Sequence, residues 1–214
     1  TVLDGNTAVA GRERGAYPLP TPLDVSLAGK TTARLLLLPD LHVPASPDIL
    51  ERILASRLLP SLDHVALLGD TVAFYGTDHE YTALGAFLAR LGKPYSAVIG
   101  NHEFSFEVHP PEQGQYGRIW KTGAPASRKL QLEKFRKFFK IEKAYWLERG
   151  AGALFLHFML EDWDAADLVC HRVKHEHDGI KELPEGGDAF FREAIETARE
   201  GSLPIIVFCH IPLS

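Results

Sequence analysis

Four short polar motifs in the sequence each follow directly on an apolar run. The motifs are Asp40-Leu41-His42, Gly69-Asp70, Gly100-Asn101-His102-Glu103 and the single residue His210. Their side chains offer carboxylate, amide and imidazole groups, a set that suits divalent manganese, iron or zinc. Open α/β sheets bind ligands just beyond the carboxyl ends of their strands. The pattern therefore predicts one metal-binding site assembled from four separate stretches of chain.

The first two motifs supply carboxylates. Asp40 and His42 are two residues apart, so both side chains lie on one face of an extended segment and can bind the same ion. The alternative is a turn aspartate beside a surface histidine. Asp70 follows the apolar run 65–68, where a buried carboxylate needs a metal, hydrogen bonds or solvent. Its two oxygens can bridge ions about 3.5–4 Å apart, although a turn or helix-capping role remains open.

The third motif is the most informative of the four. Gly100 permits a tight turn at the end of a strand, and Asn101 supplies a neutral oxygen ligand. His102 can point toward a leaving group, while Glu103 can orient its imidazole and favour the charged, proton-donating form. A polar loop is the alternative. A lone histidine at position 210 would be structural, but its place in the repeated pattern favours a metal ligand.

Regular elements alternate along the chain in the order needed to position these motifs. Apolar runs predict strands at 33–38, 64–68 and 95–99, separated by helices that begin at 46–47 and at 77, which indicates a largely parallel sheet. The second half predicts a helix at 127–140, a hairpin at 143–158, a helix at 188–199 capped by Asp188, and a strand at 204–209. The polar segment 104–126 is expected to form part of the site wall. Residues 1–30 are expected to form an irregular N-terminal arm, and residues 31–214 the domain itself.

Composition limits the classes of function. The 214 residues include 45% hydrophobic and 24% charged residues, and the formal net charge is −5. This balance is typical of a globular domain and argues against nucleic acid as a partner. No apolar stretch has the length of a membrane span. The two cysteines, Cys170 and Cys209, do not indicate a disulfide framework, so we expect a cytoplasmic protein, with a removed signal peptide as the alternative.

Taken together, the motifs resemble the calcineurin-like metallophosphoesterase superfamily in order and spacing. The family pattern runs Asp-x-His, Gly-Asp, Gly-Asn-His-Asp/Glu, His and then Gly-His-x-His, and the matching motifs here extend from Asp40 to His210. The resemblance implies an α/β fold, a two-sheet sandwich flanked by helices in four layers (α/β/β/α). It also implies hydrolysis of a phosphoester substrate by a hydroxide that two divalent or mixed-valence ions (manganese, iron or zinc) activate.

The resemblance also implies a role for each matching residue. Carried over by position, Asp40 and His42 bind the first metal, Asp70 bridges both, Asn101 and His210 bind the second, and His102 is the general acid, assisted by Glu103. Asn101, His102 and the loop residue His109 are the expected substrate contacts.

The sequence departs from the family pattern in one respect. Gly-His-x-His, which contributes one imidazole to each metal in the family, does not occur among the 214 residues. We expect a domain that is incomplete at its C-terminus; a site completed by another chain and a degenerate homologue are the alternatives. Two other functions therefore stay open, a non-catalytic binding module and a nuclease of the same superfamily. The oligomeric state is not predicted.

Overall fold

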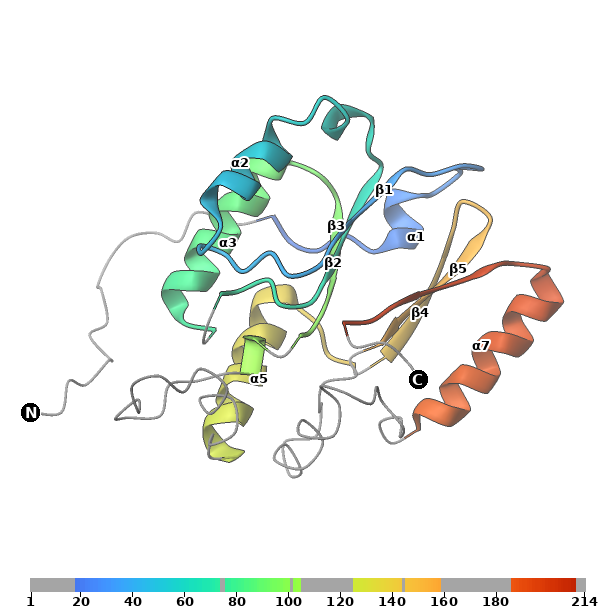
Figure 1. Cartoon of the computed structure of the whole chain (residues 1–214). Coiled ribbons are helices and arrows are strands. Elements are labelled where there is room, and N and C mark those ends of the chain that lie inside the picture. Colours follow the sequence, from blue (N-terminus) through green and yellow to red (C-terminus); the bar gives the residue numbers. More distant parts are fainter. Residues whose placement is uncertain are drawn as a thin grey trace, which may run out of the picture.

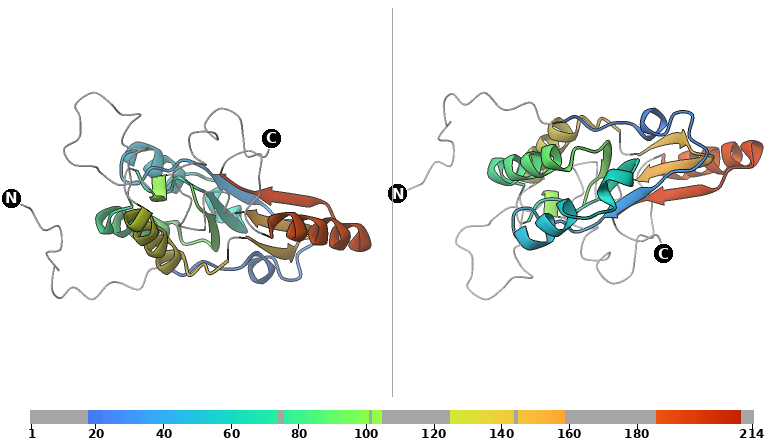
Figure 2. Two further views of the ribbon diagram at one scale, coloured as in Figure 1. Left: turned by 90° about the horizontal axis from the view of Figure 1, so that it is seen from below. Right: turned by 90° about the horizontal axis from the view of Figure 1, so that it is seen from above.

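The computed structural model describes residues 18–73, 76–100, 102–104, 125–143, 145–158 and 186–210. Two three-stranded sheets pack against each other, with helices on both outer sides (Figure 1). Helices α2 (Pro47–Leu54), α3 (Asp78–Leu91) and α5 (Pro125–Phe139) lie beside the first sheet, and α7 (Gly187–Gly201) lies beside the second (Figure 2). This arrangement confirms the predicted α/β sandwich.

The first sheet consists of parallel strands in the order β1 (Leu35–Leu38), β2 (His64–Leu68) and β3 (Tyr95–Val98). Parallel pairing aligns the strand ends, with Leu38 opposite Leu67 and Leu68 opposite Val98. A short 3-10 helix, η1 (Leu59–Ser61), precedes β2. Thr77 and Glu80 form a reciprocal capping box at the start of α3, which satisfies amide donors that the first helical turn leaves free. The polar motifs therefore leave the sheet at one common edge.

The second sheet combines a hairpin with a crossover strand. Strands β4 (Tyr145–Gly150) and β5 (Ala153–Phe158) pair antiparallel, and β6 (Ile205–Phe208) runs parallel to β5. Helix α7 packs on its outer face through a cluster of buried residues. The prediction that Asp188 caps α7 is wrong, because the N-cap is Gly186, with a left-handed φ of 77°, and no side chain caps the helix.

The larger hydrophobic core fills the space between the sheets and beneath the helices of the first sheet. Leu67, Phe135, Phe155 and Phe208 are among its buried members, and they come from both sheets and from α5. None of the helices in the described part of the chain has the length and hydropathy of a membrane span.

Residues 18–30 are part of this packing, and they include a helix that the sequence did not predict. Helix α1 (Leu23–Ser26) buries Leu23 almost completely. The backbone N–H of Leu23 donates to Glu148 Oε1 over 2.9 Å, and the Thr21 N–H donates to the Tyr95 carbonyl over 2.8 Å. This stretch therefore ties the edge of β3 to β4 in the other sheet.

The buried imidazole of His64 makes the stability of this region depend on pH. Its ring nitrogens lie 2.8 Å from Ser26 Oγ and 3.0 Å from Ser96 Oγ. Burial lowers the His64 pKa to about 4. The charge of Glu148 acts to raise this pKa, and the charge of His157 acts to lower it further. Because the unfolded state binds this proton at higher pH than the folded state does, stability falls as pH drops from about 6.5 to about 4. Linkage gives a loss of roughly 3 kcal/mol from this one group.

Urea unfolding at pH 7, 5.5 and 4.5 checks this expectation. A His64→Gln variant should lose less stability than the wild type between pH 7 and pH 4.5, because its side chain does not titrate. His79→Gln, which alters an exposed histidine of α3, should retain the wild-type dependence. Equal slopes for the wild type and His64→Gln would contradict the assignment.

Candidate metal centre

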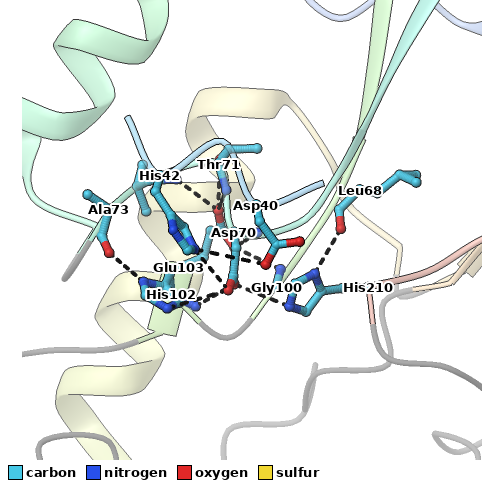
Figure 3. Close-up of polar contacts among 11 residues, drawn as sticks. Asp40, His42, Leu68, Asp70, Thr71, Ala73, Gly100, His102, Glu103 and His210 are labelled. Atoms are coloured by element: carbon cyan, nitrogen blue, oxygen red, sulfur yellow. Dashed lines mark hydrogen bonds and ion pairs between the residues drawn. The ribbon is translucent and has the colours of Figure 1, made fainter. Parts of the chain in front are cut away.

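Five of the predicted site residues converge at one edge of the two sheets (Figure 3). Asp40 and His42 follow β1, Asp70 follows β2, His102 follows β3, and His210 follows β6. Strands β1, β2 and β6 each end two residues before a residue that can bind a metal, and β3 ends four residues before His102. The aligned ends of parallel strands thus bring together side chains that lie far apart in the sequence.

The backbone that carries these side chains has an unusual conformation. Asp40, His42 and Asp70 have left-handed φ angles of 52°, 48° and 50°. Residues other than glycine rarely adopt such angles, which cost about 1–3 kcal/mol each and cluster at functional sites. Beyond the strands, the two loops stay paired: the Asp40 N–H donates to the Gly69 carbonyl over 3.2 Å, and the His42 N–H to the Asp70 carbonyl over 3.0 Å. These hydrogen bonds hold the first two motifs side by side.

Asp70 is the centre of the site, and it is only 3% exposed. Its Oδ2 lies 3.5 Å from His42 Nε2 and 3.5 Å from His102 Nε2, and its Oδ1 lies 3.5 Å from His210 Nε2. Asp40 Oδ1 lies 4.0 Å from His42 Nε2. Each carboxylate oxygen of Asp70 therefore faces a different part of the site.

Among the residues that the structure describes, two groups of three have ligand atoms close enough to hold a metal ion. One contains His42, Asp70 and His102, and the other contains Asp40, Asp70 and His210; within each, the atoms lie within 4.8 Å of one another. Both groups include Asp70. This grouping places Asp40 with His210, whereas the family resemblance assigns Asp40 and His42 to the same ion.

Backbone carbonyls fix the orientation of two of the imidazoles. The Nδ1–H of His210 donates to the Leu68 carbonyl over 2.9 Å, and Nδ1 of His102 contacts the Ala73 carbonyl. A proton held on Nδ1 leaves Nε2 as the titrating nitrogen, and in both rings Nε2 faces Asp70. Histidines that bind metals in proteins characteristically make this second hydrogen bond.

The charges of these groups depend on one another. Burial alone would raise the pKa of the Asp70 carboxyl, but hydrogen bonds with His210 and His42 hold it well below its usual range. Burial alone would lower the pKa of His210, but its interaction with Asp70 raises it to about 9. A hydrogen bond with Asp70 likewise raises the His42 pKa. A metal ion can replace these protons beside the carboxylate, so binding should release them.

The residues present fit divalent metal ions. A buried, ionised carboxylate lies between imidazoles whose Nε2 atoms point toward it, and a second carboxylate, Asp40, lies at the exposed side. Oxygen and imidazole ligands in this combination suit manganese, iron and zinc, and they do not select one of these metals.

Glu103 has contacts that the sequence did not predict. It lies in the short 3-10 helix η2 (His102–Phe104), and its carboxylate accepts hydrogen bonds from the backbone of Asp70, Thr71, Val72 and Gly100. The contact at Nδ1 of His102 is the Ala73 carbonyl rather than a carboxylate. No sequence signal identifies a backbone carbonyl as the partner of a histidine. Asn101 and His109, the remaining predicted site residues, lie outside the described residues.

Comparison with protein families gives a match to a known family. The sequence matches the family described as Calcineurin-like phosphoesterase over residues 33–214, which includes all of the motifs and both sheets. A comparison with curated proteins found no match. Because the family match covers most of the sequence, the chain belongs to the calcineurin-like phosphoesterase family.

Proposed function

We propose that this chain is a hydrolase that cleaves a phosphoester with two divalent ions at the candidate metal centre. The observation that carries the proposal is the position of Asp70, which belongs to both groups of candidate ligands and whose two oxygens face His42 and His210. His102, the third member of one group, is assigned to proton transfer instead of metal binding. A carboxylate with two differently directed oxygens can bridge the two ions of a dinuclear centre. Family membership supports the same reaction class.

The protein residues have distinct tasks in this reaction. Asp40, His42, Asp70 and His210 hold the ions, and Asn101, by its position in the third motif, is proposed as a further ligand and substrate contact. When bound, the ions activate water as the nucleophile and offset the negative charge that develops on the phosphoryl oxygens. In-line attack then requires a proton donor on the side of the leaving group.

His102 is the proposed proton donor. Its Nδ1 contacts the Ala73 carbonyl, so the proton available for transfer is the one on Nε2 of the charged ring. The side chain is 14% exposed, and its Nε2 lies 3.5 Å from Oδ2 of Asp70. After the phosphoester bond breaks, the leaving-group oxygen takes this proton. His109 is proposed only as a substrate contact, from its place in the loop after the third motif.

Hydrolysis of p-nitrophenyl phosphate and bis(p-nitrophenyl) phosphate tests the proposal. We expect release of p-nitrophenolate with Mn²⁺ present, loss of release with EDTA, and recovery when excess Mn²⁺ is added back. Heat-treated protein carried through the same purification is the control. Hydrolysis that EDTA leaves unchanged would contradict a metal-dependent reaction.

A non-catalytic binding module is the second candidate. It is favoured by the small number of candidate ligands among the described residues, which is three in each group. Titration with Mn²⁺, followed by calorimetry or by the electron paramagnetic resonance signal of free Mn²⁺, separates the two candidates. Two bound ions with turnover support the hydrolase, whereas one weakly bound ion without turnover of either ester supports the binding module.

A further inference from the structure

We propose that Glu103 is a positioning residue that sets metal affinity by fixing the backbone of residues 70–72. This inference rests on the proposed function, because it concerns the same metal centre. Glu103 is 0% exposed and lies in η2, five residues after the end of β3. A buried carboxylate requires hydrogen-bond donors around it, and the identity of those donors shows what it holds.

Both carboxylate oxygens of Glu103 are used by the chain around Asp70. Oε2 accepts from the N–H groups of Asp70 (3.0 Å) and Gly100 (2.7 Å). Oε1 accepts from the Thr71 N–H (2.6 Å), the Thr71 hydroxyl (2.7 Å) and the Val72 N–H (3.3 Å). Three consecutive amides thus converge on one anion, in the manner of a backbone nest.

The same three residues also hold the loop after β1. The carbonyl of Asp70 accepts from the His42 N–H (3.0 Å), and the carbonyl of Thr71 accepts from the Val43 N–H (2.9 Å). On the other side, Asp70 Oδ1 accepts from the His102 N–H over 2.8 Å. One carboxylate therefore fixes the segment that connects the loops of the first three motifs.

This arrangement stabilises the left-handed conformation of Asp70, whose φ is 50°. Its N–H can reach Glu103 while its side chain faces the imidazoles, so the anion and the metal ligand are held on opposite sides of one residue. Removing the anion should let the backbone relax. The two Asp70 oxygens would then lose their alignment with both groups of ligands.

Glu103→Gln tests this role with little change in shape. An amide side chain has one acceptor oxygen, so its NH₂ group must face at least two of the five donors that the carboxylate now accepts. We expect the Kd for Mn²⁺ to rise about 10- to 100-fold, the range for partners that orient metal ligands. Unchanged Mn²⁺ affinity in the folded variant would overturn the proposal.

Glu148→Gln is the matched control. Glu148 is also a buried carboxylate, and it accepts from the Leu23 N–H and lies 2.7 Å from His157 Nε2, within the other sheet. Both variants should have lower thermal stability, but only Glu103→Gln should bind Mn²⁺ more weakly. An equal loss of Mn²⁺ affinity in both variants would mean that lower stability, and not the loss of the Glu103 contacts, weakens metal binding. That result would overturn the proposal.

Two further measurements separate this role from orientation of His102 and from a failure to fold. The effect of Glu103→Gln on Mn²⁺ affinity should persist in a His102→Ala background; if it vanishes there, Glu103 acts through the imidazole. Thr71→Val removes one donor without removing the charge and should weaken Mn²⁺ binding less, in the same direction. If Glu103→Gln does not fold, the Mn²⁺ affinity of Thr71→Val tests the proposal in its place.

Hydrogen exchange of the metal-free chain gives a readout that depends on neither metal nor turnover. The amides of residues 70–72 should exchange faster in Glu103→Gln than in the wild type, and at the wild-type rate in Glu148→Gln. Unchanged exchange at these amides would overturn the proposal. Wild-type protein that binds no Mn²⁺ and hydrolyses no ester would count against the proposed function alone.

Discussion

Asp70→Asn is expected to weaken both metal positions at once and to abolish hydrolysis. Asp70 belongs to both groups of candidate ligands, and its two oxygens face different imidazoles. An asparagine keeps the shape and can still accept from the His102 N–H, but it has one oxygen and no charge. Activity should fall at least as far as the roughly 10²- to 10³-fold loss that follows removal of a single donor from a site of developing charge.

Asp40→Asn is the matched control for this substitution. Asp40 occurs in only one of the two groups, and its side chain is 55% exposed. We therefore expect Asp40→Asn to weaken one bound ion and leave the other, whereas Asp70→Asn affects both. The number of Mn²⁺ ions bound per chain, measured by calorimetry and by elemental analysis after dialysis, distinguishes these outcomes. Two ions bound at wild-type affinity in Asp70→Asn would rule out a bridging role.

The removal of the Asp70 charge has a second consequence in the metal-free chain. The raised pKa values of His42 and His210 depend on that carboxylate. In Asp70→Asn both imidazoles should therefore titrate at lower pH than in the wild type, where the His210 pKa is about 9. Nuclear magnetic resonance titration of the histidine ring protons, without metal, measures this shift. Unshifted His210 in the variant would show that the two side chains do not interact.

The regular elements and the common position of the motifs could be predicted from the sequence because both depend on local patterns. Apolar runs mark strands such as β2 and β5, whose observed bounds are His64–Leu68 and Ala153–Phe158. Parallel pairing then requires the strand ends to meet. Helix α1 was missed because it has only four residues, and what stabilises it is burial of Leu23 against the sheets, which has no local signature.

The sequence was less informative about contacts within the site. Glu103 follows His102 directly, which suggests a pair, but the carboxylate instead reaches the backbone of a loop more than 30 residues earlier. The donors are main-chain amides, which every residue other than proline carries, so no residue type identifies them. The left-handed conformation of Asp40 and His42 has only a weak residue signal, because glycine is absent from both positions, although Asp and His adopt such angles more often than most other residues.

Gly100→Ala is expected to disrupt the site and to lower stability by about 3 kcal/mol or more. A Cβ at this position would overlap with the backbone nitrogen and Oδ1 of Asp70 and would lie 3.0 Å from the carbonyl carbon of Gly69. These atoms belong to backbone and to a central ligand, so they cannot move aside as the end of a flexible side chain can. Overpacking of this kind costs about 1–3 kcal/mol.

A second cost follows from the hydrogen bond between the Gly100 N–H and Glu103, which spans 2.7 Å. If the chain shifts to make room for a methyl group, this buried donor loses its partner, which costs about 1–3 kcal/mol more. Gly152→Ala is the control, because a Cβ there meets nothing within 4 Å, and only its left-handed φ of 75° resists the change. The left-handed backbone conformation costs an alanine about 1–2 kcal/mol of stability relative to glycine.

Chemical unfolding of the two variants without metal measures both costs on one scale. Gly100→Ala should lose at least 1 kcal/mol more stability than Gly152→Ala, because overlap and a lost hydrogen bond exceed a backbone term alone. It should also bind Mn²⁺ more weakly, since the atoms that must move include Oδ1 of Asp70, while Gly152→Ala should bind Mn²⁺ as the wild type does. A Gly100→Ala variant with wild-type stability and affinity would show that the loops of the second and third motifs are not packed as closely as the structure has them.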